Sequence, residues 1–496
     1  MHYKLMSTSE EKIDAWTGMI HVGDSVSVMS CMPSKSIHAV IFSPPYWALR
    51  NYGDGLVSVW GGDEGCEHDW GEEINLGPCN EHGDSSIFKG KDYGDAQAAA
   101  GGGNRGRFCK KCDAWEGQLG LEPKFDMYVA NMVRVCAEVK RILRDDGSLW
   151  LNIGDTYSGG GGSVGHKSDT KNCGSKTSEY GAVDTSSITK VEDIQDKCKL
   201  LIPHRVAIAL ISDGWILRND VVWYKPSRMP ESVKDRLTKS FEFFFHFVKK
   251  KKYHYDLDAI RVPHKCYDGG ESGSVGPVAK GTQDEFINAN KKTSVAHPNG
   301  KNPGDVFEVN TASFPGKHFA VFPPELLEIP VKACVPQKVC AKCGKPYERI
   351  VEKHKVDLEN GALKKMGVDE DGNYDGEGKE DESGMAENPS DVKRNILKSF
   401  GFQKDFVGWN KKCKCDTEET KPGIVLDPFM GSGTTGEVAE NFSRRWIGID
   451  ISSEYAKMAM ERINEGVSYI RKKATLERKV EKAKKENHSL FEFGGD

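Results

Sequence analysis

The 496-residue sequence contains no apolar run long enough to cross a membrane, and its N-terminus shows no secretory signal pattern. These absences exclude a membrane-spanning chain with long apolar segments and favour a cytoplasmic protein without a membrane partner. The composition, with 38% hydrophobic and 29% charged residues, is that of a globular protein. Its length allows several compact parts.

The sequence also has little net charge, −5 at pH 7, which by itself argues against a nucleic-acid partner. The charge is unevenly distributed, however. Residues 369–391 contain ten acidic residues and one lysine, a local charge of −9, so the remainder of the chain carries +4. A mildly basic body with an acidic excursion is compatible with binding a polyanion.

Several of the fourteen cysteines form Cys-x-x-Cys or Cys-x-Cys pairs, which in an intracellular protein favour a metal over disulfides. In tetrahedral zinc sites each short pair can fill two positions. The first candidate set is Cys66, His68, Cys109 and Cys112. Its members are separated by a long stretch, so unconnected loop residues, or Cys79 as a competing ligand, remain alternatives. The second set is Cys340, Cys343, Cys413 and Cys415. Four thiolates leave zinc no open position, so this set predicts a structural site.

The apolar run at residues 37–42 (IHAVIF) is typical of a buried parallel strand. Residues 43–47 (SPPYW) follow it, and two consecutive prolines cannot continue a strand ladder. The strand therefore ends at the carboxyl edge of its sheet, where open α/β sheets place their chemistry. A rigid turn with a hydroxyl, carbonyl oxygens and aromatic faces suits a flat ligand that carries an amino group.

Residues 423–450 have the pattern of a strand, a glycine-rich turn, a helix and a second strand that ends in Asp450. A dinucleotide is the first alternative for such a turn. The turn is not G-x-G-x-x-G, however, and Asp427 at its start would repel a pyrophosphate. S-adenosylmethionine fits better, since its amino group suits the end of the first strand and its ribose hydroxyls suit Asp450.

The motif SPPY at residues 43–46 and the motif DPFxGxGTT at residues 427–435 together resemble those of the amino-methylating DNA methyltransferases of bacteria, archaea and phages. The catalytic motif precedes the cofactor motif, which resembles the circularly permuted β class. The stretch at 117–123 (GQLGLEP) and the cysteine pairs resemble a subgroup of such enzymes. The resemblance implies an α/β fold with a Rossmann-like, seven-stranded, mostly parallel methyltransferase sheet, circularly permuted and interrupted by irregular zinc-bearing insertions.

The resemblance covers roughly residues 20–50, 120–155, 200–260, 305–335 and 420–465, and it predicts how the chain is divided. Core segments are expected at 1–52, 121–260 (with a loop at 155–200), 305–335 and 421–465. Insertions are expected at 53–120, 261–304 and 336–420. Recognition of the target sequence is expected to lie in these insertions and in the loop at 155–200. A charged helical tail is expected at 466–496.

The resemblance also assigns the site. The catalytic residues would be Ser43, Pro44, Pro45 and Tyr46. The cofactor would contact Asp24, Asp427, Pro428, Phe429, Gly431, Gly433, Thr434, Thr435 and Asp450. Local sequence alone favours a helix N-cap for Asp24, whereas the resemblance places it beside the cofactor adenine.

The implied reaction is transfer of a methyl group from S-adenosylmethionine to the exocyclic amine of a base flipped out of double-stranded DNA. In the family a serine at the first motif position accompanies cytosine N4 methylation, so we expect that base, with adenine N6 as the alternative. A catalytically inactive, zinc-containing DNA-binding protein is another alternative, and protein glutamine methyltransferases rank third. The resemblance implies a prokaryotic or phage-infected host cytoplasm and, within a restriction-modification pair, a cognate nuclease. It indicates no oligomeric state.

Overall fold

The computed structural model describes residues 9–49, 52, 56–74, 106–158, 191, 193–228, 231, 233–262, 301–311, 323–355 and 402–464. The acidic segment at 369–391, Cys79 and the tail after residue 464 lie outside these ranges. The chain divides into two compact units. The larger comprises Met1–Tyr255, Asp305–Pro346 and Cys413–Asp496, and the smaller comprises Asp256–Gly304 and Tyr347–Lys412.

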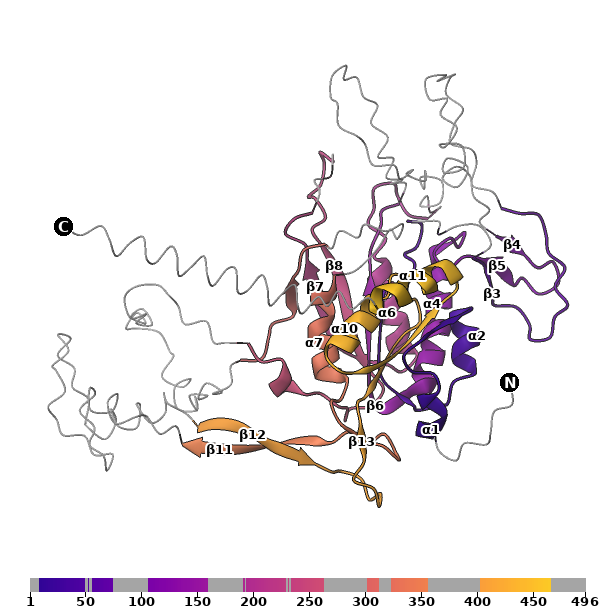
Figure 1. Ribbon diagram of the computed structural model, residues 1–496. Helices are drawn as coiled ribbons and strands as arrows, with labels where there is room; N and C mark the ends of the chain where they lie inside the picture. Colours follow the sequence, from indigo (N-terminus) through magenta and orange to yellow (C-terminus); the bar gives the residue numbers. More distant parts are fainter. Residues whose placement is uncertain are drawn as a thin grey trace, which may run out of the picture. The chain divides into compact units, whose positions relative to one another are not determined.

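A single large sheet forms the centre of the larger unit, and its strands β6, β7 and β8 are labelled in Figure 1. The strand order is β1-β15-β14-β2-β6-β8-β7-β9. The strands are β1 (Ile20–Val22), β2 (Ile37–Phe42), β6 (Leu143–Ile153), β7 (Ile216–Tyr224), β8 (Phe241–Val248), β9 (Val306–Glu308), β14 (Ile424–Asp427) and β15 (Arg445–Asp450). Strand β8 is antiparallel to both neighbours, and every other pair is parallel. The predicted mostly parallel α/β sheet is therefore confirmed.

The sheet has eight strands among the described residues, so the expected number of seven is wrong. The additional strand is β9, which covers the edge of β7. The Val222 N–H donates to the Asp305 carbonyl, and the Val309 N–H donates to the Tyr224 carbonyl, at 2.9 and 3.0 Å. This three-residue strand pairs with the last three residues of β7 and is itself only a short edge strand.

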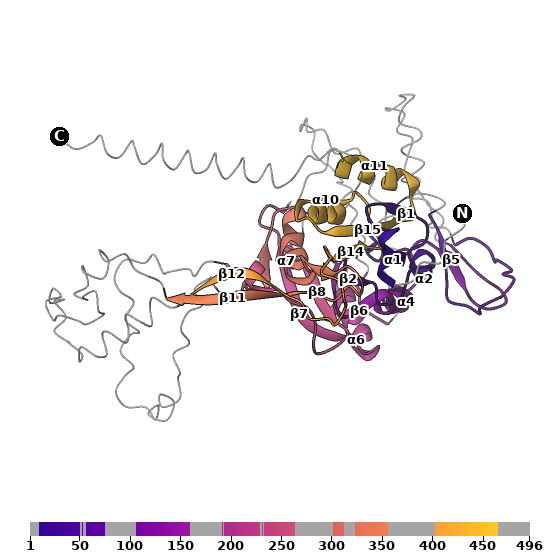
Figure 2. The same cartoon turned by 60° about the horizontal axis from the view of Figure 1, so that its bottom comes forward.

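Helices cover both faces of the sheet (Figure 2). Helices α2 (Ser25–Ser30), α4 (Phe125–Ile142) and α6 (Ile202–Ser212) contribute to one shared apolar core, to which α1 (Ser9–Asp14) adds Ile13. Helices α7 (Pro324–Cys334), α10 (Thr434–Asn441) and α11 (Ser453–Asn464) form the other group, in which α10 contacts both of its companions. No helix in the described part of the chain is long and apolar enough to cross a bilayer.

The end of α4 differs from the sequence-based expectation. The pattern predicts that the helix ends near residues 145–147, but it ends at Ile142 and continues directly into β6. A bulge between the Ile37–Leu143 and Ala39–Ser148 pairs accommodates the intervening residues. Gly147 lies there because a Cβ atom would approach the His38 carbonyl oxygen to 2.8 Å.

Smaller sheets accompany the large one. The larger unit contains a three-stranded antiparallel sheet of β3 (Ser58–Trp60), β5 (Trp115–Gly117) and β4 (Arg107–Phe108). It also contains the pair β10 (Val339–Cys340) and β13 (Thr420–Lys421). The smaller unit contains the 3-10 helix η1 (Leu257–Ala259) and a two-stranded antiparallel ribbon of β11 (Glu348–Lys355) and β12 (Phe402–Asn410).

The order of the strands determines where a ligand can bind. Strand β14 continues through α10 to β15 on one side, whereas β2 leads to β6 on the other side, and β14 and β2 are neighbours. The connections therefore diverge at this pair. In open α/β sheets such a point leaves a crevice at the carboxyl ends of the two strands.

Candidate active site

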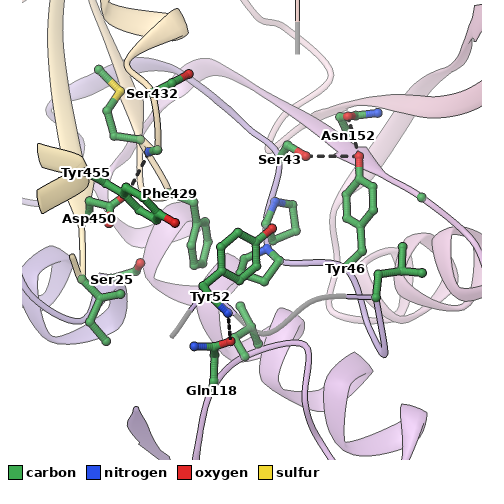
Figure 3. Close-up of a pocket in the computed structure, with 18 of the residues that line it drawn as sticks. Ser25, Ser43, Tyr46, Tyr52, Gln118, Asn152, Phe429, Ser432, Asp450 and Tyr455 are labelled. Atoms are coloured by element: carbon green, nitrogen blue, oxygen red, sulfur yellow. Dashed lines mark hydrogen bonds between the residues drawn. The ribbon is translucent and has the colours of Figure 1, made fainter. Parts of the chain in front are cut away.

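A cavity of about 460 Å³ lies at the carboxyl ends of the central strands (Figure 3). It brings together the two motifs that are almost 400 residues apart in the sequence. Figure 3 shows Ser43, Tyr46 and Asn152 on one side of the cavity, with Asp450 and Tyr455 on the other. The predicted residues that line it are Asp24, Ser43, Pro44, Pro45, Tyr46, Phe429, Gly431, Thr434 and Asp450.

The turn after β2 is held by a chain of hydroxyl hydrogen bonds. The Ser43 hydroxyl donates to the Tyr46 hydroxyl oxygen at 3.2 Å. The Tyr46 hydroxyl in turn donates toward Asn152 Oδ1 at 2.8 Å and Glu242 Oε2 at 3.0 Å. Burial, together with the Glu242 charge, raises the pKa of Tyr46 well above its ordinary value, so it remains a donor. Since the single Ser43 hydrogen is used, the Ser43 oxygen is an acceptor toward the cavity.

A buried ion pair anchors this chain. Lys225 Nζ lies 2.5 Å from Glu242 Oε1 and 3.8 Å from the centroid of the Trp223 ring. Burial would raise the pKa of the Glu242 carboxyl, but the charge and hydrogen bond of Lys225, the charge of Lys239 and the Tyr46 hydrogen bond together outweigh burial, and the pKa is lowered. Glu242 therefore stays ionised and accepts the Tyr46 hydrogen bond. Sequence reasoning missed Asn152, Lys225 and Glu242, although Glu242 is the one acidic residue in the aromatic strand FEFFFHFV.

Two glycines allow the catalytic turn to fit. A Cβ atom on Gly154 would lie 2.6 Å from Cε2 of Tyr46, so only glycine leaves room for the ring. Gly120 has φ +92°, and a Cβ atom there would lie 3.0 Å from the Tyr46 carbonyl oxygen. The Gly120 carbonyl accepts the Ala48 N–H at 2.7 Å. The stretch GQLGLEP therefore packs against the catalytic turn and hydrogen-bonds to Ala48 just after it.

Asp427 shapes the loop after β14. Its side chain is buried, and Oδ1 accepts the Phe429 N–H at 2.9 Å while Oδ2 accepts the Thr435 hydroxyl at 2.6 Å. Burial raises the pKa of the Asp427 carboxyl to about 7, although both hydrogen bonds oppose that shift. Asp427 and Thr435, like Pro428 and Gly433, are not among the residues that line the cavity. Direct contact of these four residues with the cofactor stays a prediction.

Asp450 and Asp24 face the other side of the cavity. Asp450 Oδ2 accepts the Gly431 N–H and Oδ1 accepts the Ser452 N–H, both at 2.8 Å. Burial raises the pKa of the Asp450 carboxyl. Asp24 is the N-cap of α2, as local sequence predicts, because Oδ1 accepts the Ser27 N–H at 2.8 Å. Its Oδ2 accepts the Ser58 hydroxyl at 2.6 Å, and the residue also lines the cavity. The cap therefore does not exclude a cofactor contact.

The structure brings both cysteine sets together. In the first set, called the first cluster below, the ligand atoms of Cys66, His68, Cys109 and Cys112 lie within 4.8 Å of one another. The same limit holds in the second cluster, formed by Cys340, Cys343, Cys413 and Cys415. Each cluster offers the donors and the number of ligands that tetrahedral zinc prefers.

The second cluster is connected to the central strands through a histidine. The His38 Nε2 atom donates to the carbonyl of Gly344, which directly follows Cys343, at 2.9 Å. On the other side of the ring the Ile424 N–H donates to His38 Nδ1 at 3.1 Å. Burial lowers the pKa of His38, so the imidazole is neutral and can make both bonds. The second cluster thereby supports the start of β14.

Comparison with known proteins decides the family. The family model described as DNA methylase, of the N6/N4 type, matches residues 37–338 and 386–461. The chain belongs to this family of DNA amino-methyltransferases. The enzyme is 30% identical over 458 residues to the Type II methyltransferase M.SfiI of Streptomyces fimbriatus. The aligned region covers 88% of this chain and 88% of the relative. The enzyme is 28% identical over 442 residues to the Type II methyltransferase M.XycI of Xanthomonas campestris pv. cyanopsidis, covering 89% of this chain and 86% of the relative.

Among solved structures, the enzyme is similar to the PvuII DNA methyltransferase, described as cytosine-N4-specific, with 14% identity and a TM-score of 0.39 over 90% of this chain and 89% of the other. Membership of the family makes this DNA methyltransferase dependent on S-adenosylmethionine. The cavity has the loop after β14 on one side and the SPPY turn on the other.

Proposed function

We propose that this enzyme methylates the N4 atom of cytosine in double-stranded DNA. The observation that carries methylation of an amino group is the orientation of the Ser43 hydroxyl, which donates to Tyr46 and therefore offers its oxygen to the cavity. The exocyclic amines of cytosine and adenine both fit this acceptor. An amino group has hydrogens to donate, whereas a carbonyl oxygen would find no donor at Ser43. Serine at this motif position is the feature that favours cytosine.

The exocyclic amine is a weak nucleophile because its lone pair is delocalised into the ring. Ser43 Oγ and the Pro44 carbonyl would accept its two hydrogens and favour the pyramidal form, which exposes the lone pair. S-adenosylmethionine supplies the electrophilic methyl group on its sulfonium. Tyr46 would stack on the flipped base, and its anchored hydroxyl fixes the plane of the ring. The amine loses one proton to solvent after transfer, so no covalent enzyme intermediate is required.

The opposite wall of the cavity would bind the cofactor. Asp450 would accept the ribose hydroxyls, and Asp24 would lie beside the adenine. The loop that begins at Asp427 would surround the methionine part, with Phe429, Gly431 and Thr434 on the cavity wall. Pro428, Gly433 and Thr435 belong to the same loop but do not line the cavity, and they would hold the loop in this conformation. The order of the motifs supports a circularly permuted core.

We propose that both clusters bind structural zinc. Each cluster offers four ligand atoms, which is the number that completes a tetrahedral zinc site. Sequence recognition is assigned to the insertions at 53–120, 155–200, 262–304 and 336–420. The Type II relatives support a role in a restriction-modification pair, with a cognate nuclease as partner and a prokaryotic cytoplasm as the setting.

Digestion of methylated DNA to nucleosides, followed by mass spectrometry, tests the base. DNA from a host that expresses the enzyme should contain N4-methylcytosine. Ser43→Ala should lose the product, whereas Ser212→Ala, at the exposed end of α6, should retain it. Appearance of N6-methyladenine without N4-methylcytosine would overturn the choice of base but retain the reaction. Absence of any methylated base, with DNA binding intact, would favour the inactive binding protein.

A further inference from the structure

The first cluster matches the dimensions of a zinc site. With zinc–sulfur distances of about 2.3 Å and zinc–nitrogen distances of about 2.0 Å, a tetrahedron places two sulfurs about 3.8 Å apart and a sulfur and a nitrogen about 3.5 Å apart. The Sγ atoms of Cys66 and Cys109 are 4.0 Å apart. Cys112 Sγ and His68 Nδ1 are 3.5 Å apart. The ligands are therefore already arranged for the ion.

The cluster joins the strands of a sheet that has little else to stabilise it. Cys66 and His68 follow β3, and Cys109 and Cys112 lie on the turn between β4 and β5. These strands have only three, two and three residues. Such short strands do not form a stable sheet by themselves, and small folds of this kind usually need a metal or disulfides. Gly62 brings the loop after β3 against the turn, since a Cβ there would lie 2.8 Å from Cys112 Sγ.

The same sheet forms part of the active site. From β3, Ser58 donates its hydroxyl to Asp24 at 2.6 Å, and both Ser58 and Trp60 line the cavity. Strand β5 continues into Gln118 and Leu119, which also line the cavity, and then into Gly120 beneath the catalytic turn. One sheet therefore contacts a carboxylate on the cofactor side and the backbone of the turn on the base side.

We propose that the metal of the first cluster holds the β3-β5-β4 sheet in place and thereby determines the affinity for the cofactor. Ser58 is the positioning residue, because it fixes one oxygen of Asp24 while the Ser27 N–H fixes the other. The inference rests on the proposed zinc and on the proposed place of Asp24 beside the adenine. It does not depend on which base is methylated.

The test combines zinc content with cofactor binding, measured by release of zinc to a chromogenic chelator and by calorimetry with S-adenosylmethionine. The wild-type enzyme should contain two zinc ions per chain. Cys112→Ser should lose one of them and weaken cofactor binding about tenfold or more, the scale of a lost charge-assisted hydrogen bond. Cys415→Ser, in the second cluster, should also lose one zinc but retain cofactor affinity. The exposed Cys198→Ser should retain both.

Ser58→Ala keeps the proposal testable if Cys112→Ser does not fold. It should retain two zinc ions and raise KM for the cofactor about tenfold, with kcat and KM for DNA unchanged, and Ser58→Thr should restore the affinity. A wild-type enzyme with no zinc in the first cluster would overturn the metal site. Loss of that zinc with unchanged cofactor affinity, or an equal loss in Cys415→Ser, would overturn the coupling. The methylated base, identified separately, tests the proposed function.

Discussion

Replacing Asp427 by asparagine should separate the cost of its buried charge from its role in the loop. Both oxygens of Asp427 accept hydrogen bonds, from the Phe429 N–H and the Thr435 hydroxyl. An amide can retain both bonds, because its oxygen still accepts and the Thr435 hydroxyl can rotate to accept from the amide nitrogen. Asparagine, however, has no proton to lose.

The magnitude follows from the pKa of Asp427, which burial raises from 3.8 to about 7 in the cofactor-free enzyme. A carboxyl whose pKa is raised by folding stabilises the folded protein while it is protonated. This contribution is complete below the pKa of the unfolded chain and is lost as the pH rises through the pKa of the folded protein. Above pH 7 the loss is on the order of 4 kcal/mol, and about half of it falls between pH 5.5 and pH 8. Over that range the Asp427→Asn variant should gain about 2 kcal/mol relative to the wild-type enzyme.

Urea unfolding of both cofactor-free proteins at several pH values between about 5.5 and 8 measures this difference. The comparison with the variant removes the contribution of all other titrating groups. The cationic cofactor should favour the ionised acid, so wild-type affinity for S-adenosylmethionine should rise up to about tenfold from pH 6 to pH 8. The variant should show no such rise. A stability difference that stays constant with pH would refute the assignment of a buried, protonated Asp427.

Three further changes test the other parts of the site. Gly154→Ala should displace the Tyr46 ring, since the new Cβ would lie 2.6 Å from it, and lower single-turnover methylation about tenfold or more while cofactor affinity is retained. Lys225→Met removes the ion-paired partner of the buried Glu242 and leaves only the longer-range charge of Lys239, so the free energy of unfolding should fall by about 3 kcal/mol in urea titrations. Cys343→Ser should lose one zinc ion and lower the midpoint of thermal unfolding by about 5 °C or more, measured by calorimetry.

The first two of these changes have a control within the same chain. Gly304→Ala should leave methylation unchanged, because a Cβ there has no neighbour within 4 Å. Lys225→Met combined with Glu242→Gln should recover much of the lost stability, because no buried charge remains unpaired. Normal methylation by Gly154→Ala, or a double variant no more stable than Lys225→Met, would contradict the hydroxyl chain described here.

The sequence predicts best those features that depend on neighbouring residues. The apolar run at 37–42 and the two prolines after it define β2 (Ile37–Phe42) with its observed limits. The glycine-rich turn before α10 and the acidic end of β15 were likewise apparent, because strand, turn and helix patterns are local. The end of α4 was not, since the bulge that replaces the expected turn depends on the fit of Gly147 against β2.

The features that the sequence did not predict depend on residues that are separated in the sequence and meet in the folded protein. Lys225 directly follows β7 and Glu242 lies on β8, and nothing near either residue in the sequence indicates that they meet behind Tyr46. The position of Asp427 is a second example. Its motif predicts a cofactor contact, which stays a prediction, and the structure adds that the buried acid accepts two hydrogen bonds from its own loop. Local sequence patterns identify the residues of a site. Which of them line the cavity and which hold the others in place is known only from the packing of the folded chain.

The order of the strands also governs how the enzyme is made. Strand β2 can pair early with β6 on one edge, but its other edge pairs with β14, and β1 pairs with β15 among the described residues. These two pairings wait for strands more than 380 residues further along the chain. At a translation rate of 5–20 residues per second, this delay is roughly 20 to 80 seconds. During that time the nascent chain exposes apolar strand edges to chaperones and cannot hold the cofactor. Methylation can therefore begin only after β15 has left the ribosome.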